Sequence, residues 1–203
     1  NLEESNKEIK QWKRKEVLKD YRFYIICMTM LAMPWIATGS FVYQSFISSS
    51  KEWGPYVIAQ SFMAYSILSV ITLFISGFLI DKFSSRKLLI YMNFPLFFAT
   101  IVLYYFDAPI SSFIFFGLVG ITNGLANVLG SSTWAEIYGV KYIGSIKALT
   151  TALMVFSTAF GTALFGFLID NGFSIEQIAI VPGTYIFGSI ILLYLVKNKL
   201  NPN

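Results

Sequence analysis

The sequence predicts an all-α membrane protein whose six transmembrane helices form two inverted three-helix repeats. Three observations lead to this fold class. Only 13% of the 203 residues are charged and 56% are hydrophobic, whereas soluble domains carry about 25% charged residues. Six long runs contain no Asp, Glu, Lys or Arg, and an identical pentapeptide closes the second and the fifth of these runs.

The six charge-free runs cover residues 23–50, 53–80, 88–106, 108–135, 148–169 and 177–196. Each is long enough to cross the hydrocarbon core of a bilayer, which takes about 20 helical residues. The runs are rich in Leu, Ile and Phe and lack the sustained alternation of membrane barrel strands. We therefore predict six spanning helices within a domain of residues 21–198.

The segments outside this domain are short and polar. Residues 1–20 hold six basic and five acidic groups, which predicts a cytoplasmic linker that enters an interfacial segment, with Trp12 as a headgroup anchor. Its long charged stretch does not fit a signal peptide. The chain begins without Met, so we expect a fragment of a longer polypeptide. Residues 199–203 are predicted to be a cytoplasmic tail.

The basic residues predict the orientation in the membrane. An even number of spans places both termini on one side, and fourteen of the fifteen basic residues fall on that side. Only Lys51 falls opposite, where Asp107 also lies. Because cytoplasmic loops carry an excess of Lys and Arg, both termini are expected to be cytoplasmic and Lys51 and Asp107 external.

The pentapeptide Gly-Phe-Leu-Ile-Asp occurs at residues 77–81 and again at 166–170. The second and fifth runs are the middle members of two triplets. A triplet is odd, so its second copy crosses the membrane in the opposite sense, as in the inverted repeats of transporter halves. Chance identity in a chain rich in Phe, Leu and Ile is the alternative explanation.

Several classes of chemistry are excluded by composition. The chain has no His and a single cysteine, Cys27, which lies inside the first run. Metal clusters, His-based catalysis and a disulfide framework are therefore not expected, and no catalytic residue, metal or cofactor is predicted. The basic residues are spread over loops without a stacking-aromatic surface beside them, so no nucleic-acid partner is expected.

The loop after the second run carries a recognisable signature. It consists of a Gly, three residues, an Asp and then basic residues, namely Gly77, Asp81, Arg86 and Lys87. This pattern resembles the loop between the second and third helices of one half of a major facilitator superfamily transporter. Residues 136–147 are similar to the loop between the fourth and fifth helices of that family. Lys82 stands where Arg is commoner, and Ser84 and Ser85 where a Gly is usual.

The resemblance, which covers residues 12–198, implies the carboxy-terminal half of a twelve-helix transporter. It implies secondary active or facilitative transport of a small-molecule substrate by alternating access, in a plasma membrane or a bacterial inner membrane. The implied partners are the missing N-terminal six-helix half and the lipid bilayer. In this family Asp81 would lock the outward-facing state against a helix of the other half, and Arg86 is near enough in sequence to balance its charge.

Polar residues suggest which helices contact the solute. The third and sixth runs hold only two and three Ser, Thr, Asn or Gln residues, and polar side chains avoid lipid, so the other four runs are expected to line a pathway. The candidate residues are Trp35, Thr38, Gln44, Tyr65, Asn123, Asn127, Ser131, Trp134, Thr151 and Thr158. Close helix packing is an equally plausible role for Gly120 and Gly124, and hydroxyls can bond their own helix.

Two other functions were weighed. A self-contained six-span channel or an oligomeric membrane subunit is the main alternative, although the chain lacks paired filter-like loops. An intramembrane enzyme ranks last because no nucleophile and base set is present.

Overall fold

The computed structural model describes residues 10–200. Within that range all elements of regular secondary structure are helices, joined by short turns and loops. Linker residues 1–9 and tail residues 201–203 lie outside the described residues. The helices are α1 (Arg14–Val17), α2 (Tyr21–Val42), α3 (Gln44–Ser50), α4 (Pro55–Phe83), α5 (Ser85–Leu89), α6 (Phe94–Tyr105), α7 (Pro109–Tyr138), α8 (Ile143–Asp170) and α9 (Ile175–Val196), followed by the 3₁₀ turn η1 (Lys197–Lys199). Six spans long and apolar enough to cross a membrane are present in this range, so the all-α six-span prediction is confirmed.

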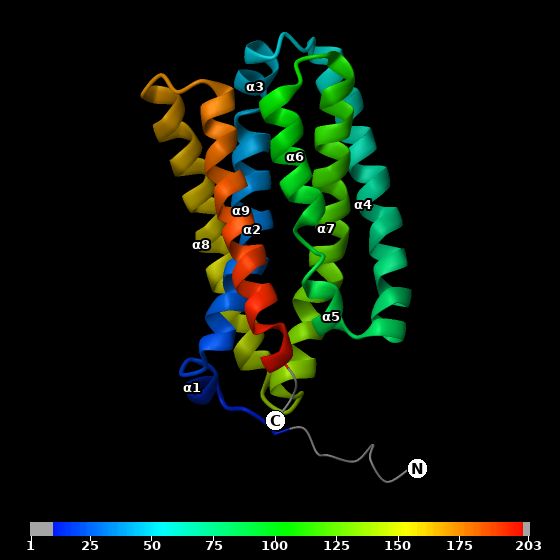
Figure 1. Ribbon diagram of the computed structural model, residues 1–203, viewed down its shortest axis with the longest axis vertical. Coiled ribbons are helices and arrows are strands. Elements are labelled where there is room, and N and C mark those ends of the chain that lie inside the picture. Colours follow the sequence, from blue (N-terminus) through cyan, green and yellow to red (C-terminus); the bar gives the residue numbers. More distant parts are fainter. Residues whose placement is uncertain (1–9, 201–203) are drawn as a thin grey trace.

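The long helices begin where the sequence supplies start signals. Pro55 and Pro109 occupy the first turns of α4 and α7, where the missing N–H of proline costs no helical bond. Asp20 caps α2 by accepting from the backbone N–H of Arg22, and Ser174 caps α9. Short connections join the end of each long helix to the start of the next, and the long helices run alternately up and down the bundle (Figure 1).

Two predicted runs are interrupted. The first run is divided at Tyr43 into α2 and α3. The third is divided into α5 and α6, and Pro95 lies in the first turn of α6. Proline disfavours helical geometry in the preceding residue and fits the start of a new helix. The Asn93 side chain at this break donates to the backbone carbonyl of Thr29 on α2, at 2.8 Å.

Each long helix packs against particular neighbouring helices. α4 lies along α7, and α2 lies along α8, while α6 contacts both α7 and α9 and α2 contacts α9 and α7 (Figure 1). The described chain ends, at residues 10 and 200, lie at one end of the bundle, which we call the terminal end; the other is the opposite end.

Glycines allow the closest contacts between helices. A Cβ at Gly120 or Gly124 of α7 would collide with the backbone of α4 at Tyr65 or Ser69, and a Cβ at Gly161 of α8 would collide with the backbone carbonyl of Trp35 on α2. The packing role considered for Gly120 and Gly124 is therefore confirmed. Small residues at such positions let membrane helices approach closely.

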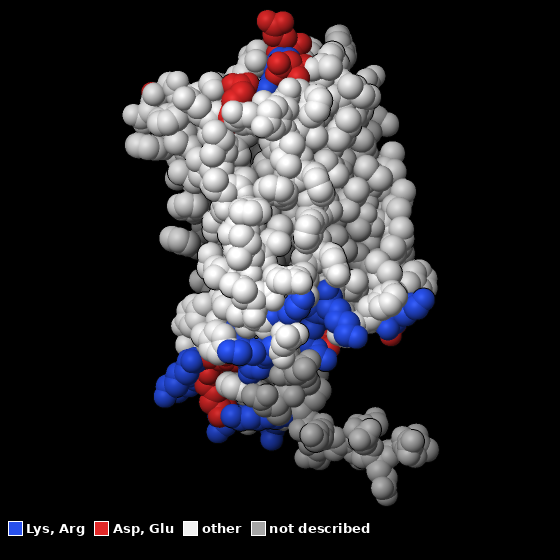
Figure 2. All heavy atoms as spheres, viewed as in Figure 1, with Lys and Arg blue, Asp and Glu red and all other residues white. Residues whose placement is uncertain are grey.

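Among residues 10–200, the charged side chains lie at the two ends of the bundle. Figure 2 shows Lys and Arg gathered at the terminal end, a small group of Asp and Glu at the opposite end, and an uncharged surface between them. Large apolar side chains such as Phe74 and Phe78 on α4 are exposed on this surface. An apolar band between two charged ends is what a bilayer requires.

Candidate functional site

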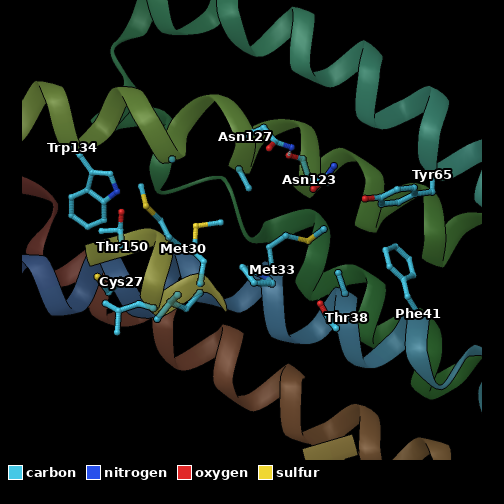
Figure 3. Close-up of a pocket in the computed structure, with 17 residues that line it drawn as sticks. Cys27, Met30, Met33, Thr38, Phe41, Tyr65, Asn123, Asn127, Trp134 and Thr150 are labelled. Atoms are coloured by element: carbon cyan, nitrogen blue, oxygen red, sulfur yellow. Dashed lines mark hydrogen bonds between the residues drawn. The ribbon is translucent and has the colours of Figure 1, made fainter. Parts of the chain in front are cut away.

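A cavity of about 300 Å³ lies between α2, α4, α7 and α8 (Figure 3). The α7 wall is polar and includes Asn123 and Asn127. The Asn123 amide donates to the hydroxyl of Ser69 on α4 at 2.8 Å, and the Asn127 amide donates to the backbone carbonyl of Asn123 at 2.9 Å. Each asparagine thus uses one N–H to fix its own position and keeps its carbonyl oxygen for another partner.

The α2 wall is apolar and contains sulfur. Met30, Met33 and Thr38 line it, and Figure 3 shows them facing the two asparagines across the cavity. These positions share one face because residues three to four apart in a helix lie above one another. α8 adds Met154 and Thr150, whose hydroxyl donates to the backbone carbonyl of Lys147.

Aromatic rings close the two ends of the cavity. Trp134 lies at one end, and Phe41 and Tyr65 lie at the other (Figure 3). Trp134 is held by a stacked Tyr138 ring, with 6.0 Å between ring centroids. Phe41 and Tyr65 pack edge to face at 5.1 Å, a favourable geometry for aromatic pairs.

The predicted pathway residues divide into two groups. Five of them line this cavity, namely Thr38, Tyr65, Asn123, Asn127 and Trp134. Thr151 is outside it because it is rotated by about 100° from Thr150, the residue that does line it. The hydroxyls of Ser131 and Thr158 lie outside the cavity and donate to carbonyls of their own helices.

Trp35 and Gln44 also lie away from the cavity. Trp35 is 3% exposed and packs into the core against α8 and α9, with its ring centroid 5.4 Å from that of Tyr185 and 6.0 Å from that of Phe160. Gln44 begins α3 and lines a groove at the opposite end of the bundle. The neighbours of a residue in sequence do not determine its face, so the sequence alone did not place either position relative to this cavity.

Several residues of the cavity were missed from the sequence. They are mainly apolar, and include Cys27, Met30, Met33, Gly130 and Thr150. A helix that is apolar on every side offers no contrast between a lipid face and a cavity face. The spacing from Met30 through Pro34 and Thr38 to Phe41 is the one signal that groups the α2 residues on one face.

The predicted gating loop lies at the terminal end. A Cβ at Gly77 would meet nothing within 4 Å, and Lys87 is exposed. Asp81 is exposed at the end of α4, and over residues 10–200 no hydrogen bond or ion pair of its carboxylate is found. This loop therefore presents an uncovered face.

Arg86 contacts a different carboxylate from the one expected. Its guanidinium forms an ion pair with Glu136 of α7, so the expected pairing of Arg86 with Asp81 is not present. Glu136 also accepts from the backbone N–H of Ser85, at 2.9 Å, and from its hydroxyl. One carboxylate thereby binds both the first N–H groups of α5, which lack helical partners, and the neighbouring cation.

The described residues before α2 dock on the same end. The backbone N–H of Trp12 donates to the carbonyl of Tyr138 at 3.0 Å, and the two rings meet edge to face. The Tyr138 hydroxyl donates to Asp20, which also pairs with Arg22 at 2.8 Å. Arg22 in turn donates to the backbone carbonyl of Lys199. Both described ends of the chain are therefore tied to the start of α2 and the end of α7.

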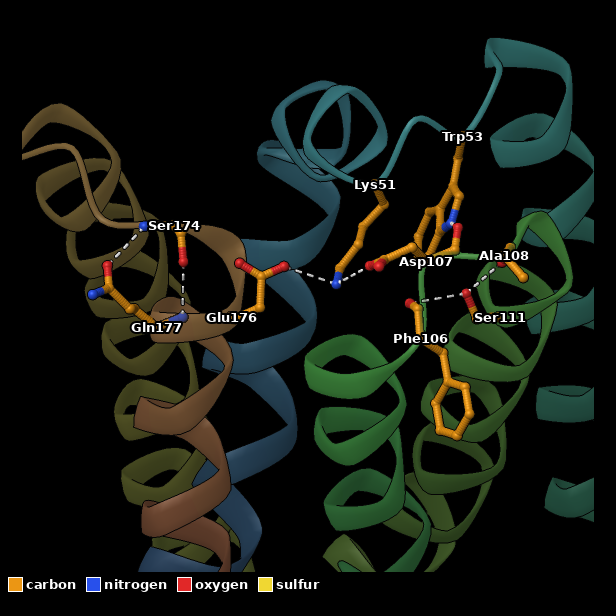
Figure 4. Close-up of polar contacts among 9 residues, drawn as sticks. All are labelled: Lys51, Trp53, Phe106, Asp107, Ala108, Ser111, Ser174, Glu176 and Gln177. Carbon is orange, nitrogen blue, oxygen red and sulfur yellow. Dashed lines mark hydrogen bonds and ion pairs between the residues drawn. The ribbon is translucent and has the colours of Figure 1, made fainter.

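One buried ammonium organises the opposite end. The Lys51 side chain is 1% exposed and contacts Asp107 at 2.5 Å and Glu176 at 2.9 Å (Figure 4). Burial lowers the pKa of Lys51, but hydrogen bonds to the two carboxylates and their charges outweigh it, so its pKa lies above the ordinary value. The Trp53 indole donates to the backbone carbonyl of Asp107 at 2.8 Å. Three connections of the bundle meet at this ammonium.

The site has the chemistry of a binding surface. No Asp, Glu, Lys or Arg lines the cavity, and within residues 10–200 no cluster of three or more His, Cys, Asp or Glu suited to a metal ion is found. The available groups are amides, hydroxyls, thioethers, the Cys27 thiol and aromatic rings, which can hydrogen-bond to a solute and pack against it.

Comparison with known proteins gives one match. The Major Facilitator Superfamily family matches residues 24–203, and neither the curated proteins nor the solved structures contain a match. The matched range includes all six membrane-spanning helices, which fit one half of a transporter of that kind. The chain therefore belongs to the major facilitator superfamily, whose members carry small solutes across membranes.

Proposed function

We propose that this chain is the carboxy-terminal half of a twelve-helix transporter that moves a small solute by alternating access, in secondary active or facilitative transport. The family match supports membrane transport in general. The charged segment that docks through Trp12 on Tyr138 has the composition of a linker between two halves and supports the carboxy-terminal assignment. A missing N-terminal six-helix half is then the partner of this chain.

The proposed inverted repeat has support in the helix contacts. α2, α4 and α6 form the first triplet of long helices, and α7, α8 and α9 form the second. Exchanging the triplets turns the α4–α7 pair into the α8–α2 pair and the α6–α7 pair into the α9–α2 pair, and all four pairs are in contact. A two-fold relation between triplets of opposite direction is the arrangement known in transporter halves.

The proposed orientation places the terminal end in the cytoplasm of a cell whose plasma membrane, or bacterial inner membrane, holds the protein. The gathering of Lys and Arg at that end supports it (Figure 2). Under this proposal residues 1–20 are a cytoplasmic linker and interfacial segment, residues 21–198 the half-domain, and residues 199–203 a cytoplasmic tail. Lys51 and Asp107 are then external.

We assign the gating role to the loop that contains Gly77, Asp81, Arg86 and Lys87. Its open face at Gly77 and the unpaired state of Asp81 within the described residues leave room for a helix of the other half. The pair between Arg86 and Glu136 holds the start of α5 in place beside that face. Asp81 is therefore the member of the loop whose partner comes from outside this half.

The cavity wall formed by Asn123 and Asn127 is the observation that carries the proposed function. The test uses the full-length protein in proteoliposomes and a panel of radiolabelled solutes. With a solute that the wild type carries, Asn127→Ala should reduce uptake about fivefold, because one uncharged hydrogen bond is lost. Ser131→Ala is the matched control, since Ser131 lies on the same helix but does not line the cavity.

Equal losses in the two variants, or a loss of uptake that follows the loss of folded protein, would contradict a role of this wall in the pathway. Folded protein is measured by size-exclusion chromatography of the same preparations.

A further inference from the structure

The residues that line the cavity between α2, α4, α7 and α8 indicate the charge and polarity of the solute that fits it. None of its residues is an acid or a base that is ionised at neutral pH. The nearest buried ion pairs lie at the two ends of the bundle, at Lys51 and at Arg22. An ion that enters a site of this kind gives up hydration without gaining a partner of opposite charge.

The polar groups of Asn123, Asn127 and Tyr65 lie along one side of the cavity, and Thr38 of α2 faces them from the other side. The carbonyl oxygens of the Asn123 and Asn127 side chains and the hydroxyls of Tyr65 and Thr38 have no hydrogen-bond partner within residues 10–200. Figure 3 shows the Tyr65 hydroxyl directed toward Asn123, so these two residues form a continuous polar edge. The amide oxygens accept hydrogen bonds and the hydroxyls both donate and accept them.

The remaining surface is apolar and polarisable. Met30 and Met33 face the asparagines, and Trp134 and Phe41 limit the cavity at its two ends (Figure 3). Thioethers adapt to irregular apolar surfaces, and aromatic rings favour flat or apolar groups placed against them. The side of the cavity formed by Asn123, Asn127 and Tyr65 is thus its more polar side.

We propose that this cavity binds an uncharged, largely apolar solute that carries hydrogen-bonding groups along one edge. This inference rests on the proposed transport function and names the class of solute. Its apolar body contacts the thioethers and rings, while its polar edge meets Asn123, Asn127 and Tyr65. The charge-free lining on this half offers no partner of opposite charge to small inorganic ions or carboxylates.

Two glycines provide a reporter and its control. Gly130 of α7 lines the cavity, Gly188 of α9 does not, and a Cβ at either position meets nothing within 4 Å. Gly130→Cys and Gly188→Cys are made separately in full-length protein that carries Cys27→Ala and no other cysteine. The rate of alkylation by N-ethylmaleimide is then measured with three probes of equal size, namely naphthalene methanol, naphthoate and naphthylmethylammonium.

The neutral alcohol should slow alkylation at position 130 and leave position 188 unchanged. Protection by the anion and the cation should be at least about tenfold weaker at the same concentration, because each has to bury an unpaired charge. The control position removes the effect of probe dissolved in the lipid. Asn127→Ala added to the reporter should weaken the protection by the alcohol.

Protection by naphthoate or naphthylmethylammonium equal to that by the alcohol would overturn the class of solute and leave the transport function standing. Absence of protection by all three probes would also overturn the inference. The transport function is judged separately by the uptake loss of Asn127→Ala, so the two failures are distinguishable.

Discussion

Two helix pairs in this bundle contact each other closely but are joined in different ways. α4 and α7 are in close contact over several turns. Gly120 and Gly124 of α7 lie directly against the backbone of α4, and the Asn123 amide donates to the Ser69 hydroxyl. The hydroxyls of Ser61 and Ser112 also bond each other, at 2.8 Å. No proline lies inside either helix beyond the first turn.

α2 and α8 meet around a proline. Pro34 inside α2 cannot donate to the helical ladder. Next to it, the Ser157 hydroxyl of α8 donates to the carbonyl of Leu31 at 3.0 Å, and Gly161 seats α8 on the backbone at Trp35. The Ser157 bond lies one residue from Met30, whose carbonyl has lost the helical donor that Pro34 cannot supply. We therefore predict that α4 and α7 are rigidly joined, whereas α2 can change shape against α8.

The two copies of the pentapeptide end one helix of each pair. Gly77 at the end of α4 faces open space, whereas Gly166 at the end of α8 lies against the Tyr43 hydroxyl. Asp81 is followed by Lys82 on the exposed gating loop, and Asp170 is followed by a turn through Gly172, whose φ is 78°. The same five residues therefore lie in different structural surroundings in the two copies.

The largest effect is expected from Gly120→Ala combined with Gly124→Ala. Each added methyl group collides with the backbone of α4, and overpacking of this kind costs about 1–3 kcal/mol per site. We expect a summed loss of about 2–6 kcal/mol, measured by thermal unfolding in detergent. Gly130→Ala is the control on the same helix, since its Cβ meets nothing. A double variant as stable as this control would show that α4 and α7 are not closely joined.

Gly161→Ala tests the second pair. Its methyl group collides with the backbone of Trp35, which predicts a loss of about 1–3 kcal/mol if α2 were rigid. Because Pro34 lets α2 adjust, we expect a value near the lower bound, below the loss for Gly120→Ala alone. Unfolding of the two single variants under the same conditions measures the difference, and a larger loss for Gly161→Ala would reverse the comparison.

Asp81→Asn and Asp170→Asn separate the two pentapeptide copies. Under the proposed gating role the first removes a contact to the other half, and a coupling of about 1–3 kcal/mol shifts state populations roughly tenfold. The second should have a smaller effect. Distances between spin labels placed at the two ends of the full-length protein report the populations. Unchanged distributions for Asp81→Asn at normal expression would remove the gating assignment.

The smallest effect is expected from single hydroxyls. Ser157→Ala and Ser112→Ala each remove one interhelical hydrogen bond, worth about 0.6 kcal/mol in membrane bundles. Hydrogen exchange should nevertheless differ, because Ser157 supports the proline-interrupted part of α2. We expect faster exchange around Leu31 in the first variant and little change in α4 in the second. Equal exchange in both would argue against a deformable α2.

The number of spans, the absence of charged chemistry and the family signature were predicted from the sequence, because an ion in hydrocarbon is so costly that charge-free runs mark helices directly. Polar residues on α7 were likewise identified, since Asn123 and Asn127 contrast with the apolar residues around them. Trp35 was predicted to contact the solute and lies in the core beside α8 and α9. Met30 lines the cavity but was not predicted, because it is one apolar residue among many on α2.

Tertiary structure decided which face of each helix lines the cavity and which carboxylate each cation meets. Arg86 is five residues from Asp81 but pairs with Glu136, and Lys51 joins carboxylates that lie 56 and 125 residues away. Short-range sequence patterns set local helix formation because its hydrogen bonds are local. Packing brings distant residues together and is set by the fit of whole helix surfaces, which no single run of the sequence contains.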